Sequence, residues 1–377
     1  MTVYDAAIIG GGPAGTALAM LLSGFGRSVI LFEKEKQAHD KVCGEFISHE
    51  GAHYLARLGV PVEGFGALPI QRVALIRRGH PLTGQLPFEA WSLSRRVLDE
   101  ALLQRAAQTG AEVRRGSRVR ELFRWGDGWK VEIEGGGAFS AKDAFLATGK
   151  HDLKRWKRPP GQQSDLIAFK AYWRLSPRQA ESLRGRVELL LFPGGYAGLQ
   201  PVEGGRANLC LLIRKSMFVR KYGSWDNLLN AMLEACPHLA SRLDGAACLS
   251  SKPLGISGLP YGHVTRKGGE LWRLGDQAAV IPSFSGDGMS IALHSAHLAA
   301  AMCLQGKSPD EYQQQLASQV TKQVARATLL SQTLVSKLGQ PLAMAATFCS
   351  RSTLALCAAS TRIRSDALVF GDVSSIV

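Results

Sequence analysis

The chain lacks the sequence features that mark several common protein classes. Its seven cysteines, spread from Cys43 to Cys357, include no C-x-x-C pair, so the sequence indicates no disulfide framework and no zinc or other metal site. It contains no low-complexity run and no stretch of about 18 uninterrupted apolar residues, so neither long disorder nor a membrane-spanning helix is predicted. The apolar run near the N-terminus has no basic region before it and is not typical of a signal peptide. A reducing, cytoplasmic environment is therefore expected.

Acidic residues are outnumbered, and the formal net charge is +14. The basic residues are mostly scattered, which disfavours a nucleic-acid partner. The densest basic cluster, between Lys150 and Arg158, is either a solvated linker or a landing patch for an anionic cofactor, lipid or acidic carrier protein. The moderately apolar segment from Pro341 to Ala359 is interpreted first as a packed helix and second as a contact with a membrane surface.

The order of apolar segments predicts a βαβ unit followed by a mixed set of elements. Residues 3–9 and 28–33 indicate buried strands, and the Ala- and Leu-rich residues 14–24 indicate a helix between them. Residues 118–134 alternate and turn at 126–128, which is typical of a hairpin. The remaining predictions are helices at 95–109 and 225–235, strands at 112–114, 143–148, 166–175, 186–192 and 206–213, parallel-sheet character at 271–274, and a mostly helical pattern from 287 onward.

A glycine-rich turn joins the first predicted strand to the first helix. Gly10 allows a tight turn, Gly12 lets the backbone approach a pyrophosphate, and Gly15 allows the helix to pack closely on the strand. The helix N-terminus offers free N–H groups to the phosphates. Glu33 ends the second strand, where a carboxylate can accept a hydrogen bond from a ribose hydroxyl of FAD or NAD. The cofactor contacts predicted here are Gly10, Gly12, Pro13, Ala14, Gly15, Glu33 and Lys34.

A later segment separates FAD from NAD. Residues 274–279, Pro282 and the Gly286-Asp287-Gly288 loop resemble the second flavin motif of the geranylgeranyl-reductase-like and aromatic-hydroxylase superfamily, which has the p-hydroxybenzoate hydroxylase fold. The resemblance implies that Asp276 hydrogen-bonds the ribityl chain and that the glycine loop lies against the isoalloxazine ring. A loop that opens a helix can place N–H groups where negative charge develops on a reduced flavin. The contacts predicted here are Asp276, Pro282, Gly286, Asp287, Gly288 and Met289.

Two shorter segments carry the same resemblance. Residues 41–45 are similar to the K-x-C-G element of geranylgeranyl-reductase-like flavoproteins, and residues 94–102 to their R-x-x-L/F-D-x-x-L helix start. In that family the arginine contacts FAD, so the resemblance implies the same for Arg95, whereas Asp99 is expected to cap or brace the structure. The motifs extend, in chain order, over roughly residues 3–305. The cofactor contacts implied here are Lys41, Cys43, Gly44 and Arg95.

Two segments depart from the family pattern. Where the superfamily usually has Asp-Gly, residues 147–150 read Ala-Thr-Gly-Lys, which leaves Gly149 as the expected contact and removes the support for a hydroxylase-like docking of NAD(P)H. No second G-x-G-x-x-G follows a strand, so NAD(P)H as an external reductant would have no dedicated domain. The Y-x-W-x-F-P element of the reductases loses two aromatic residues, which implies a different or roomier substrate pocket. The predicted pocket residues are Tyr196, Gly198, Gln200 and Pro201.

The motifs and the order of elements together predict an α/β protein in three parts. A Rossmann-like FAD-binding domain is discontinuous, with an inserted antiparallel-sheet substrate domain and a helical C-terminal region. The predicted boundaries are 1–75, 95–158 and 265–310 for the FAD-binding domain, 76–94 and 159–264 for the substrate domain, and 311–377 for the helical region.

Three functions fit these motifs. The first is a reductase or dehydrogenase that moves hydride through FAD to or from an apolar, unsaturated small molecule; the second is an FAD-dependent monooxygenase of secondary metabolism; the third is a non-redox flavin-binding protein. Cys43 is the candidate catalytic residue, because a nearby cation would favour its thiolate and suit it as a proton donor or redox partner. A small buried apolar role is the alternative for Cys43. His294 and His297, one helical turn apart, are interpreted as packing or capping residues.

Overall fold

The computed structural model describes residues 3–350 and 352–368, and the strands in these residues form two sheets. The first sheet contains, in spatial order, β6 (Glu112–Arg115), β2 (Val29–Glu33), β1 (Val3–Ile9), β9 (Ala138–Leu146), β8 (Gly128–Ile133) and β7 (Val119–Trp125), with β16 (Trp272–Arg273) also paired to β9. Strands β6, β2, β1, β9 and β16 pair in parallel, whereas β7, β8 and β9 form an antiparallel meander.

The parallel strands of the first sheet are covered on both faces. All five residues of β2 are buried, as expected for a central parallel strand. Helices α1 (Pro13–Gly24), α3 (Arg95–Gln108) and α8 (Gly288–Leu304) pack on one face, and the β7–β8 hairpin packs on the other through Trp129 and Val131. Ser94 caps α3 by accepting a hydrogen bond from the Val97 N–H at 3.3 Å. The strands predicted at 3–9 and 28–33 and the hairpin at 118–134 are confirmed.

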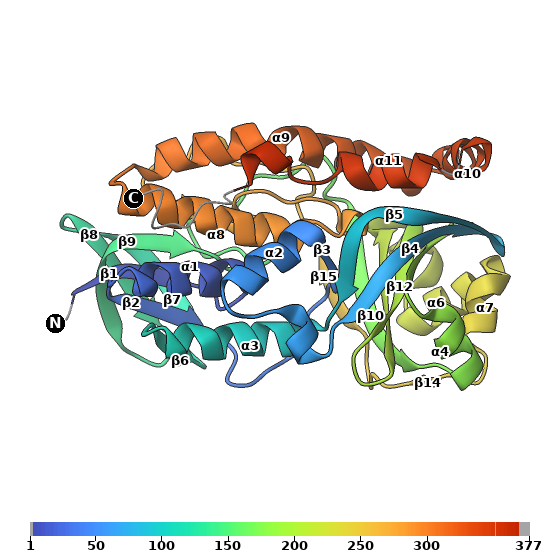
Figure 1. Ribbon diagram of the computed structural model, residues 1–377, viewed down its shortest axis with the longest axis horizontal. Coiled ribbons are helices and arrows are strands. Elements are labelled where there is room, and N and C mark those ends of the chain that lie inside the picture. The colour runs from blue at the N-terminus through green and yellow to red at the C-terminus, as the bar shows by residue number, and fades with distance from the viewer. Residues whose placement is uncertain (1–2, 351, 369–377) are drawn as a thin grey trace.

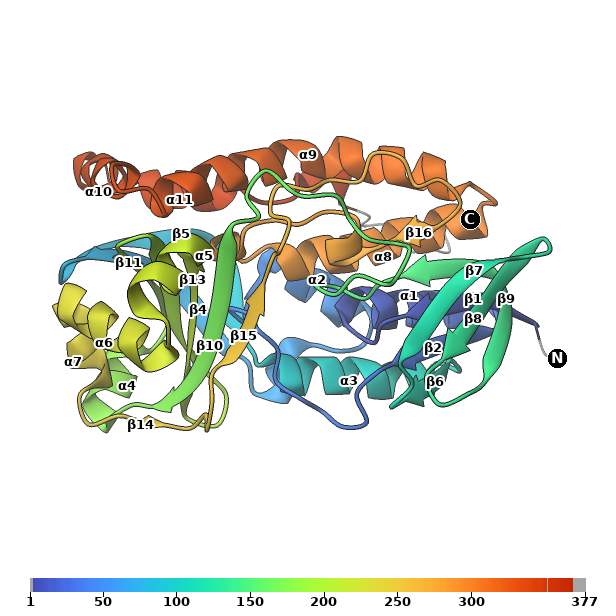
Figure 2. The same cartoon turned by 180° about the vertical axis from the view of Figure 1, so that it is seen from behind.

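The second sheet is almost entirely antiparallel. It contains, in spatial order, β14 (Ala247–Cys248), β10 (Leu166–Arg174), β13 (Arg206–Arg214), β12 (Gly195–Val202), β11 (Arg186–Phe192), β4 (Leu68–Arg77), β5 (His80–Ser92) and β3 (Phe46–Ser48), with β15 (Leu254–Ser257) also paired to β10. Only the β11–β4 pairing is parallel among these described pairs. Figure 2 shows α4 (Pro177–Leu183), α6 (Trp225–Ala235) and α7 (Pro237–Leu243) covering its outer face.

The second sheet starts earlier in the chain than predicted. The predicted boundary assigned residues 1–75 to the cofactor domain, but β4 begins at Leu68 and pairs with both β5 and β11. Residues 68–75 therefore belong to the second sheet. Polar and proline residues interrupt the apolar run of β4, and its parallel partner β11 lies more than a hundred residues later in the chain. Its antiparallel partner β5 is local and follows the two-residue turn Arg78-Gly79, a hairpin that is absent from the predicted elements.

Strand β12 was also not predicted, because glycine and proline are uncommon inside strands. A Cβ at Gly195 would lie 2.3 Å from the carbonyl oxygen of Leu212 on β13, so this position admits only glycine. The packing of β12 between β11 and β13 thus overrides its low intrinsic strand preference.

The C-terminal helices form a layer along one side of both sheets. Helix α9 (Pro309–Leu334) begins with a capping box between Ser308 and Glu311. Figure 1 shows α9 beside α8, with α10 (Gly339–Cys349) and α11 (Ser352–Ser360) continuing over the second sheet. Residues 369–377 of the predicted helical region lie outside the described residues. Shorter helical elements are α2 (His49–Arg57), η1 (Val62–Phe65), α5 (Lys215–Met217), η2 (Phe218–Tyr222), η3 (Gly275–Gln277), η4 (Ser283–Ser285) and η5 (Ser365–Ala367).

Candidate cofactor and active site

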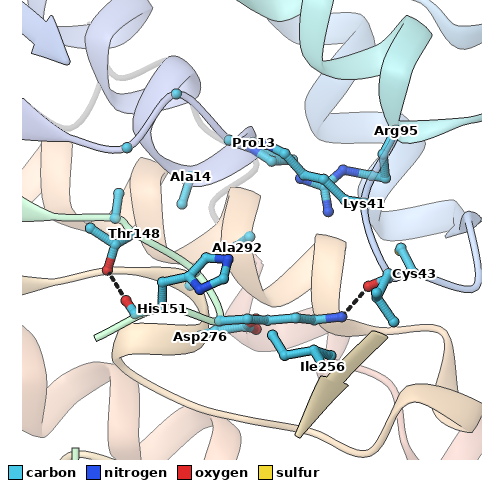
Figure 3. Close-up of a pocket in the computed structure, with 18 of the residues that line it drawn as sticks. Pro13, Ala14, Lys41, Cys43, Arg95, Thr148, His151, Ile256, Asp276 and Ala292 are labelled. Carbon is cyan, nitrogen blue, oxygen red and sulfur yellow. Dashed lines mark hydrogen bonds between the residues drawn. The ribbon is translucent and has the colours of Figure 1, made fainter. Parts of the chain in front are cut away.

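A cavity of about 790 Å³ lies where the two sheets meet. Its walls come from the carboxyl ends of β1, β2 and β9, from loop 39–46, from β15 and from residues 274–292. The crevice beyond the carboxyl ends of parallel strands is where open α/β sheets bind their ligands. Figure 3 shows Lys41 and Arg95 beside Pro13, with Cys43 on the same flank and Thr148 and His151 on the other.

The glycine turn closes tightly at one end of this cavity. Gly10 has a φ of +116°, and a Cβ there would lie 2.3 Å from the carbonyl oxygen of Ala147. A Cβ at Gly15 would lie 1.9 Å from the carbonyl oxygen of Gly10, so the helix and strand approach as closely as predicted. By contrast, a Cβ at Gly12 would meet only the Arg95 guanidinium, at 3.6 Å. The space over Gly12, beside a cation and a helix N-terminus, fits a pyrophosphate.

Two cations at the glycine turn are held by one carboxylate. The Arg95 guanidinium donates to both oxygens of Asp99, at 2.7 and 2.9 Å, and Lys41 Nζ donates to Asp99 Oδ2 at 2.7 Å. Burial alone would raise the pKa of Asp99, but Arg95 and Lys41 together lower it below its ordinary value. Asp99 thus braces the structure, and the three side chains leave one net positive charge for an anionic ligand.

Glu33 lies at the carboxyl end of β2 with a fixed carboxylate. Oε2 accepts from the Gly11 N–H at 3.0 Å, and Oε1 accepts from the Glu35 N–H at 2.9 Å. Glu33 and Lys34 both line the cavity, and their contacts with a ribose and a cofactor stay predictions.

Figure 3 shows Ile256 and Asp276 on the side of the cavity away from Pro13 and Arg95. The residues predicted to contact the flavin that line the cavity are Asp276, Gly149, Gly286, Gly288 and Met289. The apolar residues in the cavity wall include Val42, Phe46, Ile256, Leu259, Val280 and Ile281. A flat heteroaromatic ring with a polar edge fits such a mixture of apolar walls and backbone donors.

Two predicted flavin contacts do not line the cavity. Pro282 caps η4, outside the cavity wall. The Asp287 side chain is fully buried behind the glycine loop, where its Oδ1 lies 3.2 Å from Nη1 of Arg362. Arg362 Nη2 also donates to the carbonyl oxygen of Ser285. The prediction is therefore corrected: Asp287 holds the loop from behind, and Arg362, which sequence reasoning missed, is its partner.

The four residues predicted to form the substrate pocket do not line this cavity either. Tyr196, Gly198, Gln200 and Pro201 lie on β12, and none of them lines it. The Tyr196 ring packs edge-on against Phe284 at 5.9 Å, and Gln200 Nε2 donates to Ser92 Oγ at 2.6 Å. The reason is the central place of β12 in the second sheet, which leaves its side chains buried between neighbours.

A buried polar network, also missed from the sequence, holds the loop that carries Cys43. Glu45 Oε1 accepts from Lys170 Nζ at 2.5 Å and from the Tyr172 hydroxyl at 2.6 Å. Asn208 Nδ2 lies 3.0 Å from Glu45 Oε2 and 3.0 Å from the Cys43 carbonyl oxygen. Burial raises the pKa of Glu45, although Lys170 lowers it. A lysine inside the apolar stretch 166–175 is the one sequence feature that could have indicated this network.

Cys43 is half-buried and lines the cavity beside Lys41 and Arg95. Its Sγ accepts from the Glu45 N–H at 3.3 Å. Burial would lower the pKa of Arg95, but Asp99 and the hydrogen-bonded Cys43 raise it above its ordinary value. The structure thus places the Cys43 thiol beside a cation, the Arg95 guanidinium, as predicted.

The basic cluster between residues 150 and 158 has a mixed role. Arg158 is buried and donates to Asp152 at 2.7 Å and to the Asp276 carbonyl oxygen at 2.7 Å, so it is structural. Lys150 and Lys154 line the cavity, and Lys150 Nζ donates to the Val42 carbonyl oxygen. The cluster therefore joins the cofactor loops and contributes positive charge at the cavity.

His294 and His297 lie in the buried core of α8, away from this cavity. His294 Nδ1 is 2.9 Å from the Tyr54 hydroxyl, and the His297 ring packs against Tyr54 at 4.4 Å. Burial lowers the pKa of His297 to about 4. These contacts confirm the packing interpretation.

Comparisons with known proteins agree with this geometry. Residues 3–137 match the family model described as FAD binding domain. Digeranylgeranylglycerophospholipid reductase 2 of Methanopyrus kandleri is 28% identical over 320 residues, covering 82% of this chain and 78% of that protein. Menaquinone reductase of Mycolicibacterium smegmatis is 24% identical over 347 residues, with the same two coverages of 82% and 78%.

Solved structures show the same fold. The flavin-dependent brominase Bmp2 superimposes with a TM-score of 0.78 at 17% identity, covering 100% of this chain and 97% of that chain. A flavoprotein/dehydrogenase from Cytophaga hutchinsonii gives a TM-score of 0.73 at 18% identity, covering 89% and 88%. At these identities the likeness concerns the fold alone.

Replacing Gly12 by valine is expected to abolish retention of FAD, because the side chain would fill the space beside Arg95 that a pyrophosphate needs. The φ of Gly12 is −85°, which valine adopts without strain, so the variant should fold. The measurement is the flavin-to-protein absorbance ratio after purification. Gly24→Val, in the same helix, is the control, since no atom lies within 4 Å of its Cβ position. A Gly12→Val protein as yellow as the wild type would contradict this assignment.

Replacing Arg362 by glutamine is expected to destabilise the protein more at pH 8 than at pH 6. Burial raises the pKa of Asp287 from 3.8 to about 7, and Arg362 limits the rise. Because the folded-state pKa exceeds the unfolded one, the stability contribution of Asp287 is complete below about 3.8 and is lost as the pH rises through about 7. Without Arg362 the pKa of Asp287 rises further and the carboxyl group takes up a proton, so the additional loss of stability at pH 8, one unit above 7, is about 1.4 kcal/mol at most.

The measurement for this second prediction is the free energy of unfolding in urea at both pH values. Arg364→Gln removes an exposed arginine two residues away and should change stability by less than about 0.5 kcal/mol at either pH. An equal loss at pH 6 and pH 8 for Arg362→Gln would contradict the assigned ionisation of Asp287.

Proposed function

We propose that this chain, an FAD-dependent oxidoreductase of the superfamily that includes geranylgeranyl-reductase-like and aromatic-hydroxylase-like flavoproteins, reduces a carbon–carbon double bond in an apolar, lipid-like molecule. The observation that carries the proposal is the change of polarity along the cavity. Lys41 and Arg95 lie on one flank of the cavity with Cys43 beside them, whereas Ile256 belongs to an apolar part of the wall away from Pro13. The names of the two reductases that align with most of this chain support the same reaction class.

The residues of the first sheet would hold the cofactor. The turn at Gly12 with Arg95 would bind the pyrophosphate, Glu33 the ribose, and Asp276 the ribityl chain. Reduced FAD supplies hydride when bound. The N-terminus of α8, at Gly288, would direct N–H groups toward the electron-rich edge of the ring.

The second sheet would bring the substrate to the apolar end. Ile256 of β15 and Leu259 line this end together with Val42 and Ile281. Such a wall favours an apolar chain over a charged or sugar-like substrate, because burying unpaired polar groups there would be costly. Substrate specificity would then come from β15 and the loop after it, which belong to the second unit of the fold.

Cys43 would supply the proton of the reaction. Addition of a hydride to one carbon of the double bond breaks the π bond, and the other carbon then takes a proton to complete the second C–H bond. The Cys43 thiol can give this proton, and the thiolate that remains lies beside the Arg95 guanidinium. A proton from solvent restores the thiol, so the cycle consumes one hydride and one proton.

We further propose NAD(P)H as the source of the hydride. Lys34, Arg118 and Lys154 line the cavity, and each lies 3.4 to 3.8 Å from a carboxylate, of Glu35, Glu134 and Glu121 respectively. Burial, followed by the nearby cations Lys34, Lys41, Arg118 and Arg158, lowers the pKa of His151. Lysine and arginine side chains at the cavity can contact the phosphates of an anionic dinucleotide. NADH or NADPH is expected to bleach the flavin absorbance in the absence of oxygen. If neither bleaches it, the proposal that NAD(P)H is the reductant is contradicted.

The reaction class is tested by supplying reductant and a panel of polyunsaturated lipids or quinones with and without oxygen. A reductase forms a product with two additional hydrogen atoms under anaerobic conditions, which mass spectrometry detects. A product that forms only with oxygen, and that carries an oxygen atom from it, would contradict the proposal and indicate the monooxygenase alternative. Reduction of the flavin without any product from the panel would limit the substrate class.

Cys43→Ala is expected to lower turnover by about 100-fold or more, because general acid catalysis contributes at least that factor. FAD retention should stay unchanged, since the neighbouring phosphate contacts are intact. Cys248→Ala, which removes an exposed cysteine of β14, is the matched control. The measurement is the rate of flavin reoxidation by substrate in single-turnover experiments. Full activity of Cys43→Ala would leave the thiol with a packing role only.

A further inference from the structure

The outer side of the C-terminal layer exposes large apolar side chains. They are 65–79% exposed, lie near the end of α9, in α10, in α11 and in the turn before α10, and are Leu329, Leu338, Leu342, Phe348 and Leu356. Exposed apolar residues are normal when scattered, but a cluster along consecutive helices indicates a binding surface. We call this set, with the cations described below, the docking face.

Helix α10 has two clearly different faces. Its inward positions, Ala343 and Met344, pack against the core of the second sheet, and Gln340 Nε2 donates to the Phe192 carbonyl oxygen at 2.7 Å. The exposed positions fall on the opposite arc of the helix at spacings of three and four residues. They are Pro341, Leu342, Ala345, Ala346, Phe348 and Cys349. The helix is therefore anchored to the body of the protein and presents an apolar outer face.

The charge of this layer has one sign. The sequence contains no aspartate or glutamate between Glu311 and Asp366. Lys322 and Arg326 are exposed on the same side of α9 as Leu329, at spacings of four and three residues, and exposed Lys337 directly precedes Leu338. A surface that combines leucine and phenylalanine with lysine and arginine, and carries no acids, is complementary to anionic lipid headgroups over an apolar interior.

The length of the helices sets how such a surface would meet a bilayer. In the described ranges 3–350 and 352–368, no single helix has both the length and the hydropathy needed to cross a membrane. The α10 and α11 segments pass that test only as a pair, and the pair is sharply bent at its break. Because the inner side of α10 is already used in the core, only its outer arc is free to enter lipid.

We propose that the docking face binds in the plane of an anionic lipid bilayer. Leu342 and Phe348 would enter the boundary between headgroups and acyl chains, and Lys322, Arg326 and Lys337 would contact the headgroups. The interaction surface is separate from the cavity, so it does not require the proposed reaction. It would also bring an apolar substrate within reach of the enzyme.

Flotation of the purified full-length holoprotein with lipid vesicles tests this proposal. Vesicles made of equal parts phosphatidylcholine and phosphatidylserine are expected to carry the protein upward, whereas pure phosphatidylcholine carries little and high salt weakens binding. Leu342→Ser combined with Phe348→Ser should lower partitioning by at least about tenfold, since each side chain buries a large apolar area. Lys337→Glu should weaken binding to the anionic vesicles only.

Trp125→Ser, which removes an exposed apolar side chain of the β7–β8 hairpin, is the matched control and should float like the wild type. The flavin absorbance of each variant verifies folding without any substrate. Wild-type protein that stays at the bottom with both vesicles, or a Leu342→Ser, Phe348→Ser protein that floats unchanged, overturns the proposal. Concentration-dependent self-association lost in the same double variant would instead make the face an interface between two copies. None of these readouts depends on turnover, so failure of the proposed reductase function would be seen separately.

Discussion

A buried ion pair between Lys170 and Glu45 ties the loop on which the candidate site depends to the second sheet. The side chains are 1% and 0% exposed, and Lys170 reaches Glu45 from β10 of the second sheet. Removing two charges from water is costly, and the cost is offset only when the remaining hydrogen bonds are made. Tyr172 and Asn208 make them. Because Glu45 has a φ of 62°, the same contacts also hold a backbone conformation that side chains rarely adopt, and Cys43 lies two residues away.

A second buried ion pair stabilises the glycine loop on another wall of the cavity. Asp287 and Arg362 hold the glycine loop that opens α8, just as Lys170 and Glu45 hold the loop before β3. In both pairs the cation comes from a part of the chain outside the cavity, and in both the carboxylate sits within two residues of a cavity-lining glycine or cysteine. The two loops that border the predicted flavin position are therefore held by different units, one by the second sheet and the other by the C-terminal layer. Loss of either cation would loosen one wall and leave a buried carboxylate without a counter-ion.

The sequence predicts the parts of the site that are local. The turn from Gly10 to Gly15, the acid Glu33 and the cation Arg95 are each recognisable within a short segment, because backbone geometry alone dictates those residues. Long-range pairings are not recognisable in this way. The parallel partner of β4 is β11, more than a hundred residues later, and Arg362 forms an ion pair with Asp287, 75 positions earlier. The aspartate in the glycine loop was assigned to the cofactor because its sequence neighbours face the cavity, but φ near +69° at Gly286 turns the chain so that Asp287 faces the core.

The C-terminal layer links these observations to the proposed biology. Arg362 follows α11 almost directly, so the same packed layer that carries the docking face also fixes the glycine loop of the cofactor site. An apolar, unsaturated substrate partitions strongly out of water, so its concentration at the enzyme is set by the lipid phase and hardly at all by the solution. A reductase held at the bilayer surface by Leu342 and Phe348 would sample that phase directly, whereas a freely diffusing one would depend on the small dissolved fraction. The substrate proposed here is poorly soluble in water. The apolar part of the cavity wall would bind it, and the apolar outer arc of α10 would keep the enzyme at the lipid phase that contains it.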